Sequence, residues 1–126
     1  MTLPVDVRRV YEDPKGKKSE YRALVDRLWP RGVAKDSVRL DDWVKDAAPS
    51  SELRRWYGHD PELFQEFSRR YRAELRKQPA SAAVDALFEA ARHRDRLVLL
   101  TATKDVEHSG ATVLAEHLRA SLSHRT

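Results

Sequence analysis

The chain has 126 residues, of which 40% are hydrophobic and 35% charged, and 24 Lys and Arg against 20 Asp and Glu give a net charge of +4. This length suits a single domain, no apolar run approaches the roughly 20 residues that span a bilayer, and the first residues form no secretory signal. Because cysteine is absent, disulfides, thiolate metal sites and cysteine nucleophiles are excluded. The composition predicts one cytoplasmic domain over 1–126 that prefers anionic partners.

Two short strands are predicted in the first part of the chain. The segment 5–11 is rich in valine and is β-prone. A second strand over 21–28 stops before Pro30, because proline cannot donate a ladder hydrogen bond and forces the residue before it into extended geometry. Trp29 and Arg31 are therefore expected in a turn just past a strand end.

The middle of the chain is predicted to be helical. Apolar residues at 40, 43, 44 and 47 follow the i, i+3, i+4, i+7 spacing of one helix face, and Pro49 ends that segment. Three more helices are expected to start at capping residues, namely Ser50 or Ser51, Asp60 and Ser81.

The clearest strand is predicted over 96–103, where four consecutive apolar residues suit a strand covered on both faces. Ser109 can cap a last helix, and 123–126 are expected to form a frayed tail. Helices join 21–28 to 96–103, so these two strands are expected to lie side by side or one strand apart and to run parallel. The strand at 5–11 can pair antiparallel or lie elsewhere in the sheet.

Strands at both ends of a helical middle predict an α/β fold, a small and mostly parallel sheet covered by helices in a single compact domain. The residues expected to lie mostly in one core are Leu24, Leu28, Phe64, Phe67, Leu97, Leu99, Leu114 and Leu118.

Charged and polar residues follow both predicted parallel strands, where open parallel sheets bind their ligands. Arg31 follows the first strand and Lys104 the second, and a helix N-terminus at Ser109 beside two cations suits an anion. The expected ligand-binding residues are Asp26, Arg27, Trp29, Arg31, Lys104 and Ser109, and the expected catalytic residues are His59, Asp105 and His108.

Several of these residues also have a structural interpretation. Asp26 and Arg27 can form a buried ion pair that fixes the sheet, and Trp29 can be a core aromatic. If Arg31 were structural, a buried carboxylate such as Asp26 would hold it, with no cavity beside it. The remaining alternatives are a surface turn at Lys104-Asp105 and a helix cap at His108.

The sequence contains no established metal or nucleotide signature. HExxH is absent, so no metal ligands are predicted, and His59, Asp105 and His108 are only a weak candidate set. GxGxxG and Walker-type loops are also absent, which argues against a standard nucleotide cradle, and no cofactor is assigned.

Five segments carry a family resemblance: Arg9–Tyr11, LVDRLWPRG at 24–32, APSSELRRWYGHDP at 48–61, FSRRYRAEL at 67–75 and LLTATKDVEHSGATVLAEHL at 99–118. In this order they resemble the YeaO-like proteins, small bacterial members of the domain of unknown function 488. The resemblance implies a compact α/β fold in a bacterial cytoplasm and supplies no established activity. Ser109 departs from the asparagine usual in that family, and an aromatic residue is frequent in the family near the position of Thr101. Matching site positions are Asp26, Arg27, Arg31, His59, Lys104, Asp105 and His108.

These features favour a protein that binds or acts on an anionic small ligand, such as a phosphorylated one, with Arg31 and Lys104 as the clamp and His59 or His108 moving a proton. The alternative is a module that binds nucleic acid or a protein through a basic surface. A basic, concave and partly apolar pocket at the strand ends would support the first function, and a flat basic stripe the second.

Overall fold

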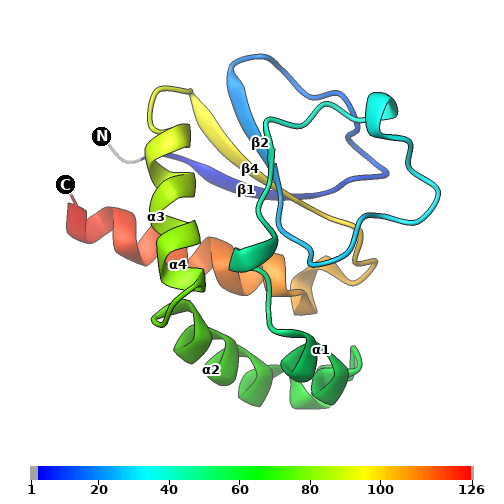
Figure 1. Ribbon diagram of the computed structural model, residues 1–126, viewed down its shortest axis with the longest axis vertical. Coiled ribbons are helices and arrows are strands. Elements are labelled where there is room, and N and C mark those ends of the chain that lie inside the picture. The colour runs from blue at the N-terminus through cyan, green and yellow to red at the C-terminus, as the bar shows by residue number, and fades with distance from the viewer. Residues whose placement is uncertain (1–2, 126) are drawn as a thin grey trace.

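A four-stranded sheet is the centre of the computed structural model, which describes residues 3–125 (Figure 1). The strands are β1 (Val5–Arg9), β2 (Glu20–Leu24), β3 (Asp42–Trp43) and β4 (Arg96–Thr101), in the spatial order β1-β4-β2-β3. Every neighbouring pair is parallel. The predicted side-by-side parallel arrangement of the second and last long strands is confirmed, and β1 pairs in parallel with β4 at the sheet edge.

Four α-helices complete the α/β fold, which is the predicted class. They are α1 (Ser51–Tyr57), α2 (Phe64–Leu75), α3 (Ala80–Ala91) and α4 (Gly110–Arg125). α1 and α2 lie furthest from the sheet, below α4 (Figure 1). Within the described residues, no helix has the length and apolar character needed to cross a membrane. The predicted frayed tail is helical in its backbone as far as Arg125, and Thr126 and the side chains from 122 onward lie outside the described residues.

The helix starts were partly predictable from capping chemistry. Ser50 Oγ accepts the N–H of Leu53 at 3.1 Å and caps α1. Asp60 caps the short 3₁₀ turn Pro61–Leu63 that leads into α2. The prediction of Ser81 as a cap was wrong, because α3 already begins at Ala80 and Ser81 lies inside it.

The helix predicted over 40–47 was also wrong. Its residues form the short edge strand β3 and a 3₁₀ turn at Lys45–Ala47. The N–H of Val44 donates to the carbonyl of Leu24 at 2.8 Å, and the indole N–H of Trp43 donates to the carbonyl of Asp26 at 2.7 Å. Pairing with the end of β2 therefore determines the secondary structure of this segment, although its apolar residues have helical spacing.

The predicted strands were too long at their carboxyl ends. β2 stops at Leu24 rather than at 28, and β4 stops at Thr101 rather than at 103. Leu28, expected in the core, is 58% exposed. The chain leaves the sheet early because the segment after β2 turns away toward Pro30 instead of continuing the ladder.

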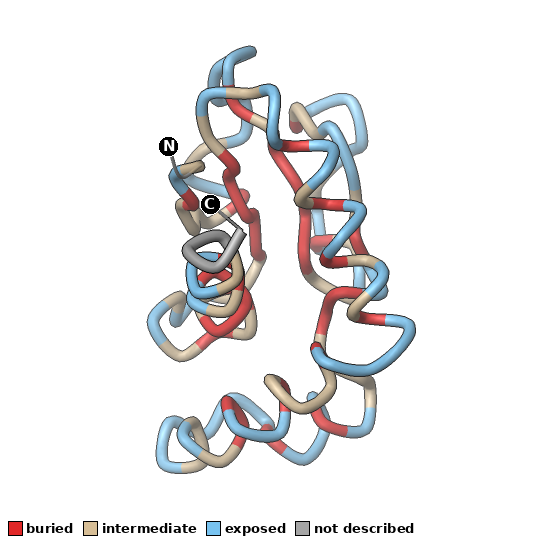
Figure 2. The backbone as a smooth tube through the Cα atoms, turned by 90° about the vertical axis from the view of Figure 1, so that its left-hand side faces the viewer, coloured by how far each residue is buried: buried red, intermediate tan, exposed pale blue. Residues whose placement is uncertain are grey.

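Buried side chains form two clusters on opposite faces of the sheet. Along β4, Leu97 and Leu99 join the cluster that contains the helices, and Val98 and Leu100 join a smaller cluster under the 29–43 connection. Figure 2 shows buried residues along the strands and exposed ones on the outer turns. Of the predicted core residues, Phe67, Leu97, Leu99, Leu114 and Leu118 lie in the helix-side cluster, Phe64 packs against it, and Leu24 lies in the smaller cluster.

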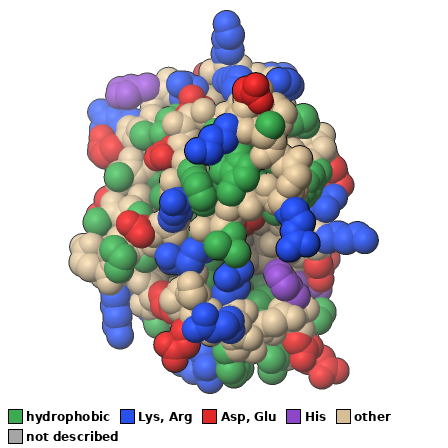
Figure 3. Space-filling model, turned by 45° about the vertical axis from the view of Figure 1, so that its right-hand side comes forward, with side chains coloured by type: hydrophobic (Ala, Val, Ile, Leu, Met, Phe, Trp, Pro, Cys, Tyr) green, Lys and Arg blue, Asp and Glu red, His purple; other side chains and the backbone are tan. Residues whose placement is uncertain are grey.

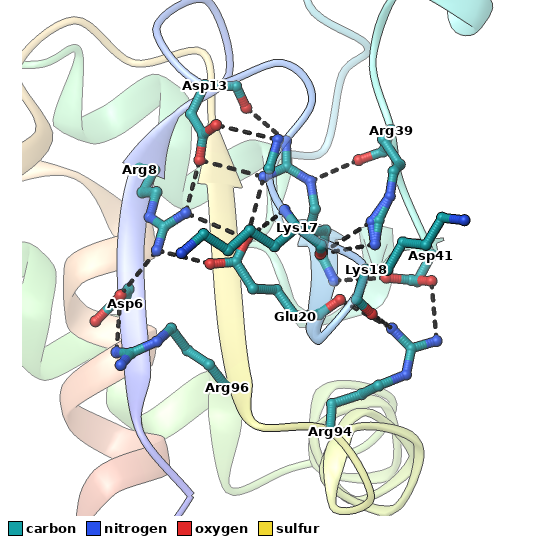
Figure 4. Close-up of polar contacts among 12 residues, drawn as sticks. Asp6, Arg8, Asp13, Lys17, Lys18, Glu20, Arg39, Asp41, Arg94 and Arg96 are labelled. Carbon is teal, nitrogen blue, oxygen red and sulfur yellow. Dashed lines mark hydrogen bonds and ion pairs between the residues drawn. The ribbon is translucent and has the colours of Figure 1, made fainter.

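A network of charges ties the loop after β1 to the sheet (Figure 4). Arg22, on β2, is fully buried, and its Nη1 lies 3.3 Å from Asp13 Oδ2. Arg8 Nη1 lies 2.7 Å from the same oxygen, and Arg8 Nη2 lies 3.0 Å from Glu20 Oε2. The Nε of Arg22 also donates to the carbonyl of Arg39 at 2.8 Å. Asp13 and Glu20 are therefore shared between Arg8 and Arg22, and Asp6 also pairs with Arg8 at 3.1 Å.

Candidate functional site

A pocket of about 510 Å³ lies at the carboxyl end of the sheet, where β2 and β4 both end. Its volume is in the range that holds a small organic ligand. Apolar groups make up most of its wall, and the first residues of α4 also face it. Of the nine residues predicted for the site, eight line the pocket: Asp26, Arg27, Trp29, Arg31, His59, Lys104, Asp105 and Ser109.

Asp26 is partly buried and receives two hydrogen bonds from the end of β4. Its Oδ1 accepts from the hydroxyl of Thr101 and its Oδ2 from the N–H of Ala102, both at 2.7 Å. Burial raises the pKa of Asp26 above its usual value, although the bonds from Ala102 and Thr101 act in the opposite direction. Perturbed carboxyl groups of this kind are frequent in functional sites.

The alternative of an Asp26–Arg27 ion pair is wrong. Arg27 turns instead toward the segment before α1, where its Nε donates to the carbonyl of Pro49 at 3.0 Å and its Nη2 to that of Ala48 at 3.2 Å. These bonds give Arg27 a structural function at the pocket wall. Asp26 forms an ion pair with no cationic side chain in the described part of the chain.

Three other cations line the pocket without a carboxylate partner. Within residues 3–125, the side chains of Arg31, Arg54 and Lys104 make no hydrogen bond or ion pair. The turn that carries Arg31 is fixed in other ways, because Tyr11 donates its hydroxyl to the Arg31 carbonyl at 2.9 Å and Gly32 has a φ of 77°. Arg31 is exposed beside a cavity, so it is not locked by Asp26.

Aromatic rings form part of the wall. Tyr57 and Phe67 stack with ring centroids 4.1 Å apart and planes 14° apart. His59 reaches the pocket through a left-handed backbone, with a φ of 59°, directly after Gly58 at 56°. A left-handed conformation is uncommon for residues other than glycine and is concentrated at functional sites.

Trp29 has the predicted packing role and also lies at the pocket. Its indole N–H donates to the carbonyl of Val33 at 2.6 Å, and its ring meets Trp43 edge-on at 5.3 Å, so it packs against the smaller core cluster. It also lines the pocket. Trp29 is therefore a packed wall residue.

His108 does not line the pocket, so its expected place beside Arg31 and Lys104 was wrong. Its Nδ1 lies 2.8 Å from Asp105 Oδ2, and its ring meets Phe64 edge-on at 5.1 Å. The hydroxyl of Tyr57 donates to the His108 carbonyl at 2.6 Å. These contacts hold the β4–α4 connection against α1 and α2.

Ser109 performs the predicted capping function. Its Oγ accepts the N–H of Thr112 at 3.3 Å, at the start of α4. The N–H groups of Gly110 and Ala111, at the pocket wall, have no hydrogen-bond partner among the described residues. The positive end of α4 therefore faces the same space as Arg31 and Lys104.

Sequence reasoning missed several lining residues. Arg54 and Tyr57 were not predicted as site residues, although their spacing of three residues on α1 places them on one helix face. Tyr11, Pro49 and Phe67 come from three other elements, and only the tertiary fold brings them here. Among the described residues, no group of three or more His, Asp and Glu is arranged to hold a metal ion.

The Asp26→Asn substitution is expected to raise the melting temperature at pH 7. The pKa of Asp26 is raised in the folded protein, so its charged form costs stability above that pKa and the cost disappears as the pH falls and the carboxyl takes up a proton. Asparagine keeps a partner for both Thr101 and Ala102 without the charge. Thermal unfolding measured from pH 7 down to pH 4 should show that the difference in melting temperature between Asp26→Asn and the parent becomes smaller. A melting temperature below that of the parent at pH 7 would contradict this prediction.

The fold and the pocket together define a small α/β protein with an open parallel sheet and a ligand-sized cavity at its carboxyl edge. The chain belongs to the domain of unknown function 488 family: residues 4–126 match the family model described as "Inactive DUF488-N3 subclade". This confirms the resemblance of the sequence to YeaO-like proteins.

Relatives cover nearly the whole chain. The uncharacterised protein YeaO of Escherichia coli K12 is 37% identical over 118 residues, which are 94% of this chain and 99% of YeaO. The uncharacterised protein Rv3073c of Mycobacterium tuberculosis H37Rv is 46% identical over 114 residues, 90% of this chain and 92% of the relative. No solved structure matches the chain significantly.

Proposed function

We propose that this protein binds a small ligand with an anionic group, such as a phosphate, in the pocket at the carboxyl end of its sheet. The observation that carries the proposal is the set of three cations, Arg31, Arg54 and Lys104, that line the pocket without a carboxylate partner among the described residues. An unpaired guanidinium offers a planar fork of donors that matches a phosphate. The free N–H groups at the start of α4 add to the same positive potential.

Binding rather than catalysis is the function we favour. The matching family model is described as an inactive subclade, and this description supports a protein that holds a ligand without transforming it. His59 at the pocket wall and Asp105 at its rim then contribute to ligand binding. Proton transfer by His59 or His108 stays a prediction, as does the cytoplasmic location.

A nucleic-acid or protein-binding surface has less support. Several arginines outside the pocket are neutralised: Glu66 pairs with Arg69 and Arg70, and Arg72 lies 2.8 Å from Glu116. On the face drawn in Figure 3, Lys and Arg side chains are interspersed with acidic and apolar ones and do not merge into a continuous stripe. Mixed charge of this kind is typical of an ordinary solvated surface.

Calorimetric titration with inorganic phosphate at low salt tests the proposal. Arg31→Ala and Arg54→Ala are each expected to weaken phosphate binding about tenfold or more, because each removes a charge-assisted hydrogen bond of about 1.5–3 kcal/mol. Arg55→Ala is the matched control, since Arg55 neighbours Arg54 on α1 but does not line the pocket. Equal binding by the parent and both pocket variants, with melting temperatures unchanged, would overturn the proposal.

A further inference from the structure

The pocket contains a carboxylate that the anion-binding proposal does not use. Asp26 lies in the wall of a mainly apolar cavity, and none of the four Arg and Lys side chains that line that cavity forms an ion pair with it. Arg54 and His59 act on Asp26 only through space, and a partly buried carboxylate without a direct ion pair is unfavourable unless hydrogen bonds compensate for it. A donor on a ligand would supply the missing compensation.

The hydrogen bonds that Asp26 already has leave room for that donor. Each oxygen accepts one bond, from Thr101 or from Ala102, both at 2.7 Å. A carboxylate has about four lone-pair sites, so one site on each oxygen is unused. Each oxygen can therefore accept one further N–H group from a ligand.

The wall beside Asp26 suits a flat ring. Tyr57 and Phe67 stack nearly in parallel, and both line the pocket together with Pro49. The two rings stack on each other and are 4% and 2% exposed, so they give the pocket an apolar floor that a planar heterocycle can contact. The cations Arg31 and Lys104 belong to the same pocket, so a ring and an anionic group can be held in one ligand.

We infer that the ligand is a phosphorylated planar heterocycle with two adjacent N–H donors, of the guanine nucleotide type, and that Asp26 accepts those donors while Arg31 and Lys104 hold the phosphate. This inference rests on the proposed function for the phosphate end only. In this arrangement the phosphate is bound by side chains and by the N-terminus of a helix. A glycine-rich nucleotide loop is therefore not needed.

Titrations with guanosine, inosine and adenosine monophosphates test the inference in the parent protein. Adenine lacks the paired N–H donors, and hypoxanthine has only the ring N–H. We expect guanosine monophosphate to bind at least tenfold more tightly than adenosine monophosphate, with inosine monophosphate between them. Equal affinities for the guanosine and adenosine nucleotides would overturn the assignment.

Asp26→Asn separates the two ends of the ligand. Asparagine replaces one acceptor with a donor, so the preference for guanosine monophosphate should disappear; inorganic phosphate should bind at least as tightly as before, because a negative charge has left the pocket. Asp36→Asn is the control, since Asp36 is exposed outside the pocket. A preference that survives in Asp26→Asn would overturn the inference.

The nucleosides distinguish failure of the inference from failure of the proposed function. If the protein binds guanosine more tightly than adenosine but binds no inorganic phosphate, the assignment of Asp26 stands and the anion site is overturned. If phosphate binding depends on Arg31 but the protein does not discriminate between the bases, the anion site stands and the assignment of Asp26 is overturned. No binding of nucleotide, nucleoside or phosphate would overturn both.

Discussion

Replacing Leu99 by alanine is expected to lower the free energy of unfolding by about 2–5 kcal/mol. Leu99 is fully buried on β4, between β1 and β2, and contacts the helix-side core. Truncation removes apolar contacts on that face and leaves a cavity that two flanking strands prevent from closing. Denaturant unfolding followed by circular dichroism measures the change.

Leu28→Ala is the matched control for this substitution. The same side chain is removed, but Leu28 is 58% exposed, so the free energy of unfolding is expected to change by less than about 0.5 kcal/mol. Because Leu28 lines the pocket rim, its variant is compared for stability only. Similar losses for both variants would show that β4 is not the centre of the core.

Asp13→Ala is expected to destabilise the protein by about 3 kcal/mol, since removing one partner leaves a buried charge uncompensated. Arg22 is fully buried, and its Nη1 lies 3.3 Å from Asp13 but 3.9 Å from Glu20. Without Asp13, Glu20 is the one carboxylate left beside Arg22 among the described residues, and it is shared with Arg8, which also pairs with Asp6. Thermal and denaturant unfolding of the variant give the magnitude, and Glu12→Ala, one residue away and exposed, is its control.

The same network predicts a loss of stability in acid. A hydrogen bond from Arg8 lowers the pKa of Asp13; burial would raise the pKa of Glu20, but bonds from the Lys17 N–H and from Arg8 more than offset it. A carboxyl group whose pKa is lowered by folding stabilises the folded protein. This stabilisation is complete above the pKa of the unfolded state, about 4, and is lost as the pH falls through the pKa of the folded state. Asp13→Ala should therefore lose less stability than the parent between pH 5 and pH 2, and parallel curves would contradict this.

The candidate site was predictable wherever it depends on strand ends. Arg31 and Lys104 follow two strands whose parallel pairing the sequence indicates, and the structure places both at one pocket. His108 was misplaced because a 3₁₀ turn, Val106–His108, rotates its ring toward Phe64 and away from the pocket. A short turn of this kind depends on what packs against it and leaves no periodic pattern in the sequence.

The sequence by itself determined the class of fold, a buried strand that begins at Arg96, and helix caps at Asp60, Ser109 and one of Ser50 and Ser51. Each depends on local chemistry or on a regular apolar pattern. Only the tertiary structure decided that 42–43 is an edge strand and that Leu28 is exposed. It also decided that Asp26 forms no ion pair among residues 3–125, and that Tyr57 and Phe67 line the same pocket. These features arise from contacts between segments far apart in the chain, whose packing and hydrogen bonds outweigh the small local preferences of each segment.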